Sequence, residues 1–170
     1  MLALSTGRIV LYGPACMTTE REVRVGGLQL VLRPAALTEI IALRHAVLRP
    51  GLPLESAAFD GDEEPATRHF GAFSEREAVG CLSLMHRERH GAGYQLRGMA
   101  TRSDLQRAGV GRALLSHAER ALKAATGARR LWCNARVESV AFYERLGWVV
   151  VSEEFDVPGV GPHHVMVWCG

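Results

Sequence analysis

The stretch Gln106-Arg107-Ala108-Gly109-Val110-Gly111-Arg112 decides the fold of this chain. It opens the clearest helical pattern in the sequence, an apolar stripe over residues 109–126. The first turn of a helix carries free N–H groups and the positive end of the helix dipole, and both suit a phosphate. The two glycines let an anion approach the backbone, and the two arginines add positive charge. A packing turn between a strand and a helix is the alternative interpretation of the same glycines.

Two common phosphate-binding motifs do not fit this stretch. A P-loop would place a lysine and a hydroxyl residue after its second glycine, and neither is present. A dinucleotide-binding fingerprint would place an acidic residue about 20 residues further on, at the end of a second strand. Glu119 lies inside the predicted helix instead, so the stretch does not predict a dinucleotide site.

Hydrophobic patterns place this helix within a mixed series of strands and helices. Strands are predicted over residues 23–32 (one strand, or a hairpin broken at Gly26-Gly27), 68–73, 78–85, 94–101, 131–134, 148–153 and 164–168. Helices are predicted over residues 37–49, 109–126 and 139–146. This order predicts an α/β fold with a mixed central sheet of about six to seven strands and helices on both faces.

The bulk properties are those of an ordinary globular domain. The chain has 170 residues, of which 48% are hydrophobic and 22% are charged, and its formal net charge is +2. We expect a single domain over residues 21–170, preceded by a loose N-terminal extension over residues 1–20. The basic residues form no dense run, so nucleic acid is not expected as a partner.

The cysteines and the hydropathy pattern bear on location. The four cysteines, at positions 16, 81, 133 and 169, include no C-x-x-C pair, so neither a disulfide framework nor a metal site is expected. This cysteine usage favours a reducing, cytoplasmic compartment. No stretch approaches about 18 consecutive apolar residues, so a membrane is not expected as a partner.

The glycine turn becomes specific when it is read together with residues further along the chain. Gln106-x-x-Gly109-x-Gly111 matches the Q/R-x-x-G-x-G/A signature of the GNAT N-acetyltransferases. The strand Leu131-Trp132-Cys133-Asn134-Ala135 follows, and residues 139–148, SVAFYERLGW, resemble the family's A-x-x-F-Y-x-x-x-G-F segment. The chain therefore resembles a GNAT acetyltransferase over residues 23–168. The resemblance implies the GNAT fold and direct transfer of an acetyl group from acetyl-coenzyme A (acetyl-CoA) to a primary amine, without a metal.

The resemblance also implies roles for individual residues. The end of the strand before the motif would hold the pantetheine arm through Met99, Ala100 and Thr101. The glycine turn would hold the pyrophosphate through Gln106, Arg107, Ala108, Gly109, Val110, Gly111 and Arg112. Asn134 would also contact the pantetheine, and Ser139 and Phe142 would line its far side. Tyr143 resembles the general acid that protonates the leaving thiolate, and a tyrosine that only packs in its helix is the alternative.

The general base and the acceptor are not evident from the sequence. The strand before the motif, Gln95-Leu96-Arg97-Gly98, has no acidic residue where the family often places one. The candidates for the base are Glu63, Glu64, His69, His163 and His164. The acceptor is expected to be an amine on a small molecule or a peptide. The acidic loop over residues 60–64 would attract a cationic acceptor, and a solvated loop without function is the alternative.

Two other classes of protein stay open at this level. One is a non-catalytic acyl-CoA-binding sensor on the same fold, although the presence of Tyr143 favours an enzyme. The other is an interaction module in which the glycine turn has only a structural role. A homodimer is also left open.

Overall fold

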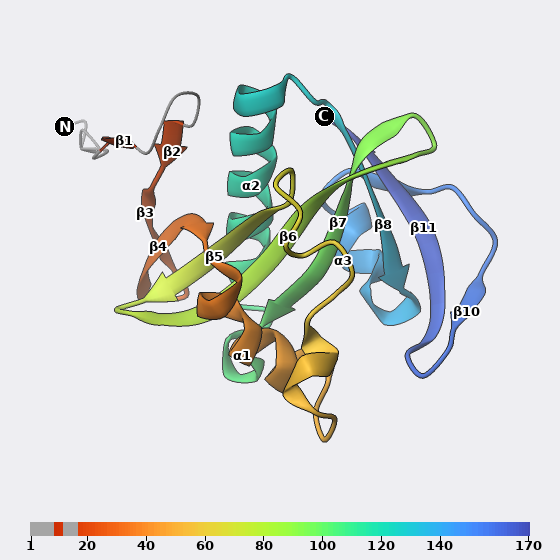
Figure 1. Cartoon of the computed structure of the whole chain (residues 1–170), viewed down its shortest axis with the longest axis horizontal. Helices are drawn as coiled ribbons and strands as arrows, with labels where there is room; N and C mark the ends of the chain where they lie inside the picture. The colour runs from red at the N-terminus through yellow and green to blue at the C-terminus, as the bar shows by residue number, and fades with distance from the viewer. Residues whose placement is uncertain (1–8, 12–16) are drawn as a thin grey trace.

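The computed structural model describes residues 9–11 and 17–170, with side chains from Glu20 onward (Figure 1). Near the N-terminus, β1 (Ile9–Leu11) pairs antiparallel with β2 (Met17–Thr19). The extension predicted over residues 1–20 lies partly outside the described residues. No helix in the described ranges is long and apolar enough to cross a membrane.

The main sheet has nine strands, which is more than the six to seven predicted. The strands are β3 (Arg21–Val25), β4 (Leu28–Ala35), β5 (Arg68–Ser74), β6 (Glu77–Arg89), β7 (Ala92–Thr101), β8 (Arg130–Arg136), β9 (Trp148–Val150), β10 (Phe155–Val157) and β11 (Gly161–Cys169). Their order is β10-β11-β8-β7-β6-β5-β4-β3, and β9 pairs with β11. Only β7 and β8 are parallel neighbours.

The higher count has two local causes. Gly26 and Gly27 both adopt positive φ, and the tight turn they make separates β3 from β4 as a hairpin. At the C-terminal end, β10 is only three residues long, too short for a readable alternation of polar and apolar residues. It pairs with the start of β11, across the turn before Gly161.

Helices cover both faces of the sheet, as predicted. Helix α1 (Leu37–Leu48) packs through Ile40 and Leu43 against Cys81 and Ala100. Helices α2 (Val110–Thr126) and α3 (Val140–Glu144) belong to the larger cluster on the opposite face, which includes Leu82, the neighbour of Cys81 in β6. In Figure 1, α1 and α2 accordingly lie apart, with the sheet between them.

The ends of the helices follow from glycine and proline. Helix α2 begins after Gly109, which adopts a left-handed φ of +98°, and ends at Gly127, whose N–H donates to the Lys123 carbonyl at 2.9 Å. Helix α1 ends before Arg49, because the residue preceding Pro50 is disfavoured in the helical region. Helix α3 is shorter than predicted, because a 3₁₀ turn over Val137–Ser139 precedes it and a turn over residues 145–147 follows it.

Candidate active site

A bulge in β7 shapes the centre of the molecule. Ser83 of β6 pairs with Arg97 and Cys81 pairs with Ala100, so two steps along β6 correspond to three steps along β7. Gly98 lies inside this irregular segment with φ +57°. A Cβ atom at Gly98 would also come within 2.8 Å of Arg44 Nε, so the position requires glycine on two grounds.

β7 and β8 separate after Gln95, just before the bulge. Their parallel pairing is confined to Tyr94 with Leu131 and Gln95 with Trp132. The following residues of β7, up to Thr101, therefore have no strand partner on the side of β8. Their backbone N–H and C=O groups are available to a ligand that enters between the two strands.

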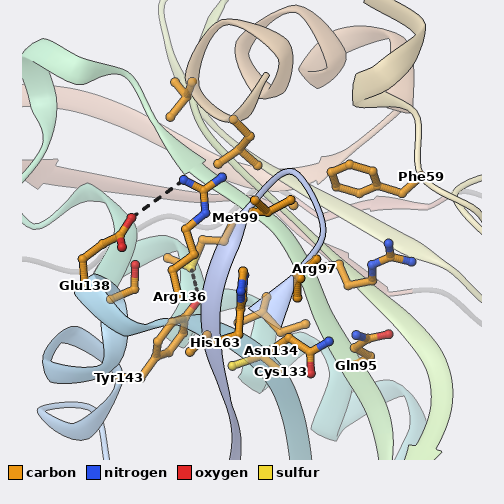
Figure 2. A pocket seen from close by; sticks show the side chains of 18 of the residues that line it. Phe59, Gln95, Arg97, Met99, Cys133, Asn134, Arg136, Glu138, Tyr143 and His163 are labelled. Atoms are coloured by element: carbon orange, nitrogen blue, oxygen red, sulfur yellow. Dashed lines mark hydrogen bonds and ion pairs between the residues drawn. The ribbon is translucent and has the colours of Figure 1, made fainter. Parts of the chain in front are cut away.

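A cleft of about 290 Å³ occupies this gap (Figure 2). Its walls come from β7, β8, the end of α1, the 3₁₀ turn before α3, and the segment joining β10 to β11. The lining residues are Val47, Leu48, Arg49, Phe59, Gln95, Leu96, Arg97, Gly98, Met99, Cys133, Asn134, Ala135, Arg136, Glu138, Ser139, Tyr143, Val157, Val160 and His163. The fold thus brings together residues that lie more than a hundred positions apart in the sequence.

The glycine turn lies beside this cleft, at the end of β7. The Gln106 side chain donates from Nε2 to the Thr101 carbonyl at 3.2 Å and so ties the turn to the strand. A Cβ atom at Gly111 would lie 3.1 Å from Met99 Cε and 3.4 Å from Thr101 Oγ1. Gly111 therefore keeps clear the space between the start of α2 and the strand end. The first N–H groups of α2 have no partner within the helix, which leaves them for an anion.

Tyr143 projects into the cleft from α3. Its side chain is 8% exposed, and its hydroxyl donates to Met99 Sδ at 3.6 Å, across the gap between α3 and β7. Burial raises the pKa of the Tyr143 phenol well above its ordinary value. The phenol therefore keeps its proton at neutral pH, as a general acid must before it acts.

The other predicted coenzyme-contacting residues lie around the same space. Asn134 is an exposed residue of β8 that faces the cleft, and Ser139 lines it from the 3₁₀ turn before α3. The Phe142 ring packs on Tyr143 with centroids 5.1 Å apart, and its Cζ lies 3.6 Å from the Cβ position of Gly111. The contacts that the resemblance predicts with pantetheine stay predictions.

Of the five candidates for the general base, only His163 lines the cleft. Its Nδ1 lies 2.7 Å from the Gly161 carbonyl and donates to it, so Nε2 is the ring nitrogen that can accept a proton in the neutral imidazole. His164 points to the other face of β11 and contacts the Ser152 carbonyl. His69 is held between Ser83 Oγ and the Asp62 carbonyl, and burial lowers its pKa.

The acidic loop does not face the cleft. Asp62 is buried in an ion pair with Arg44, at 2.5 Å, and Glu64 pairs with Arg87 on the surface, at 2.6 Å. No carboxylate of residues 60–64 lines the cleft. The paired carboxylates of Asp62 and Glu64 are therefore not free to bind an acceptor in the cleft.

Sequence reasoning missed the cationic residues of the cleft. Arg49, Arg97 and Arg136 line it, together with Phe59 and Glu138. The one available signal was Arg97, a charged residue in the strand that leads to the glycine turn. Arg49 and Arg136 reach the cleft only through the tertiary fold, so the sequence around them does not indicate that they line it.

Comparisons with known proteins show the family of this chain. A family model described as the acetyltransferase (GNAT) domain matches residues 53–168. The uncharacterized N-acetyltransferase YitI of Bacillus subtilis is 32% identical over 141 residues, which cover 81% of this chain and 94% of that protein. The chain therefore belongs to the GNAT family, and it is an acetyltransferase. The predicted family, fold and enzyme class are confirmed.

Solved structures support the same fold. Escherichia coli ElaA superposes with a TM-score of 0.68 at 18% identity, covering 89% of this chain and 99% of that one. A putative N-acetyltransferase from Lactobacillus plantarum gives 0.69 at 21% identity, covering 82% and 97%. An aminoglycoside 6'-N-acetyltransferase complexed with coenzyme A gives 0.61 at 16% identity, covering 78% and 89%.

Proposed function

We propose that this chain transfers an acetyl group from acetyl-CoA to a primary amine by direct attack of the amine. One observation carries the proposal. The cleft between β7 and β8 joins three features in one place: the unpaired β7 edge beyond the bulge, the open start of α2 at Gly111, and the buried Tyr143 hydroxyl.

The residues present fit the coenzyme. Gly111 leaves room that a Cβ atom would fill, against Met99 and Thr101. The backbone N–H groups of residues 107–112 would hold the pyrophosphate, and Arg107 and Arg112 are exposed beside them. The β7 edge from Met99 to Thr101 and the Asn134 side chain would hold the pantetheine arm. When bound, acetyl-CoA supplies the acetyl carbonyl as electrophile and a thiolate as leaving group.

Two residues of the cleft would move the protons of the reaction. His163 Nε2 accepts a proton from the attacking amine, whose nitrogen forms the new bond to the carbonyl carbon. Tyr143 donates its phenol proton to the sulfur as the carbon–sulfur bond breaks. The proton held by His163 then returns to Tyr143 through solvent, so the products are an N-acetyl amine and the free thiol. The burial that raises the pKa of Tyr143 also raises the proton affinity of a thiolate formed beside it.

Ligand-dependent melting tests the binding half of this proposal. Acetyl-CoA and CoA should raise the melting temperature, because a ligand that binds only the native state stabilises it, whereas NADH and ATP should raise it much less. Release of free thiol across a panel of amines tests the catalytic half. An unmoved melting temperature at CoA concentrations well above micromolar would contradict the proposal. Binding without turnover of any amine would instead support the non-catalytic sensor.

A further inference from the structure

We propose that the acceptor of this enzyme is a small amine that carries a carboxylate beside an apolar group, and that Arg97 and Arg49 bind the carboxylate. This inference rests on the proposed function and narrows its substrate class. It starts from the charges that line the cleft, which are three guanidinium groups and one carboxylate.

The single carboxylate is already engaged at one end of the cleft. Glu138 Oε1 lies 3.8 Å from Arg136 Nη1, and their side chains are 71% and 34% exposed. Figure 2 shows this pair on the side of Tyr143, whereas Arg97 lies beside Phe59 on the opposite side. Glu138 therefore does not pair with Arg97 or Arg49.

Arg97 is a half-buried cation with no ion-pair partner among the described residues. Its Nη1 donates to the Asp60 carbonyl at 3.2 Å and to Met85 Sδ at 3.6 Å. Neither acceptor carries a charge, and Nε and Nη2 make no hydrogen bond within the described chain. Burial lowers the pKa of this guanidinium, which reflects the cost of holding its charge away from water. An anion bound at the fork of Arg97 would offset that cost and form charge-assisted hydrogen bonds.

Several arginine guanidinium groups contact the Phe59 ring at this end of the cleft. The guanidinium of Arg97 lies 5.0 Å from the centre of the Phe59 ring, and that of Arg49 lies 5.4 Å from it. Arg44 also contacts the ring, at 4.8 Å, but its charge is neutralised by buried Asp62. Arg49 donates only to the neighbouring Leu48 carbonyl, at 3.2 Å, among the described residues. Two guanidinium groups without an ion-pair partner among the described residues therefore contact one aromatic ring.

Arg49 and Arg97 lie apart from the glycine turn that would bind the coenzyme phosphates. Arg49 directly follows α1, and α1 packs on the face of the sheet opposite to α2. The glycine turn opens α2, so the coenzyme phosphates would bind on the other side of β7. The cations at Phe59 are thus left for the second substrate. Apolar side chains beside them, Val47, Leu48, Val157 and Val160, suit an apolar group on that substrate.

Matched amines test the carboxylate directly. Thiol release should be measured with leucine and 3-methylbutylamine, and with phenylalanine and 2-phenylethylamine, since each pair differs only in the carboxylate. We expect kcat/KM to favour the amino acid by about tenfold or more, as loss of a charge-assisted hydrogen bond implies. Equal or better use of the plain amines would overturn the proposal. Better use of the aminophosphonate analogue of leucine would overturn the assignment to a carboxylate.

Variants separate a specific contact from a general charge effect. Arg97→Gln should abolish most of the preference for the amino acid over the plain amine in each pair, mainly through KM. Arg49→Gln should reduce the same preference while the contact of Arg97 with the Asp60 carbonyl stays in place. Arg129→Gln is the matched control, because it removes the same charge from an exposed side chain outside the cleft, and it should keep the preference. Parent-like preference in both cleft variants would overturn the proposal. If Arg97→Gln does not fold, Arg49→Gln decides.

A binding measurement makes the result independent of turnover. In the presence of CoA, N-acetyl-leucine should bind more tightly than N-acetyl-leucinamide, and Arg49→Gln should narrow the difference. Equal affinities would overturn the inference. If acetyl-CoA does not change the melting temperature and no amine causes release of thiol from acetyl-CoA, both the proposed function and this inference are wrong. If amines are acetylated without regard to a carboxylate, only the inference falls.

Discussion

Removing the Tyr143 hydroxyl as Tyr143→Phe tests the assignment of the general acid. The hydroxyl makes one weak hydrogen bond, to Met99 Sδ at 3.6 Å, whereas the ring keeps its contacts with Phe142 and Trp148 at centroid distances of 5.1 and 5.3 Å. Stability should therefore change by no more than about 1 kcal/mol, or roughly 2–4 °C in melting temperature for a chain of this size.

The rate should change much more than the stability. Loss of a positioned acid costs about 10²- to 10⁴-fold, which corresponds to about 2.7–5.5 kcal/mol in activation free energy. The loss should appear in kcat, with acetyl-CoA affinity nearly unchanged, because the proton is needed only as the sulfur leaves. Thiol release with a saturating amine gives kcat, and calorimetry gives the affinity.

Tyr94→Phe is the matched control for this experiment. It deletes the same hydroxyl from a half-buried tyrosine of β7 that contacts His86 and does not line the cleft. This variant should turn over normally. An unchanged kcat in folded Tyr143→Phe, measured where no burst shows slow product release, would refute the assignment and leave Tyr143 as a packing residue.

Three further predictions concern the glycine turn and two histidines. Gly109→Ala should lower the free energy of unfolding by about 1–3 kcal/mol because φ is +98°. Gly111→Val should chiefly weaken acetyl-CoA binding, by about tenfold or more, and Gly111→Ala should weaken it less, because its side chain fills less of the space. Melting and calorimetry measure both effects. His163→Gln should lower kcat by about a hundredfold or more, and the control His164→Gln should not. Burial lowers the pKa of His117 from 6.5 to about 4, so protonation of His117 disfavours the native state. The contribution of the neutral His117 to the free energy of unfolding should therefore be fully present above pH 6.5 and fall progressively towards pH 4. The full pKa shift corresponds to at most about 3 kcal/mol in the free energy of unfolding, and partial solvent screening reduces this to about 2 kcal/mol. Melting curves measured against pH should show this loss of stability in the parent and not in His117→Leu.

The parts of the site that are local in sequence were predictable. The glycine turn spans seven consecutive residues, and a helix start with free N–H groups is a property of those residues alone. Tyr143 was predictable because its short helix follows the strand at Asn134 in the order of the family. The bulge at Gly98 left no such signal, since a glycine in a strand pattern is equally compatible with a turn or a close packing contact.

The parts that depend on strand pairing were not predictable. Five candidates for the base could not be ranked, because only the pairing of His163 with Arg136 across β11 and β8 brings one of them to the cleft. The same holds for the cations, since Arg49, Arg97 and Arg136 come from three separate elements. That the acidic loop attracts a cationic acceptor stays a prediction, and pairing of charges in the fold bears on it too. Asp62 and Glu64 of this loop pair with Arg44 and Arg87, and the sequence alone does not reveal which charges are already paired.

The pairing of Arg44 with Asp62 explains why neighbouring arginines take different roles. Arg44 is fully buried and donates to Asp62, to the Ala57 carbonyl and to Ser83 Oγ. Asp62 in turn accepts from the Phe59 N–H at 2.7 Å, which fixes the loop above the bulge. A buried cation that is paired with its counter-ion stabilises the fold, because removing either partner would leave an unpaired charge in the interior. Arg97 contacts the same ring without an ion-pair partner among the described residues, and for this reason we propose that it binds an anionic ligand. The loop predicted to supply negative charge to the site thus pairs with two arginines, Arg44 through Asp62 and Arg87 through Glu64, and we propose that Arg97 and Arg49 remain for the acceptor.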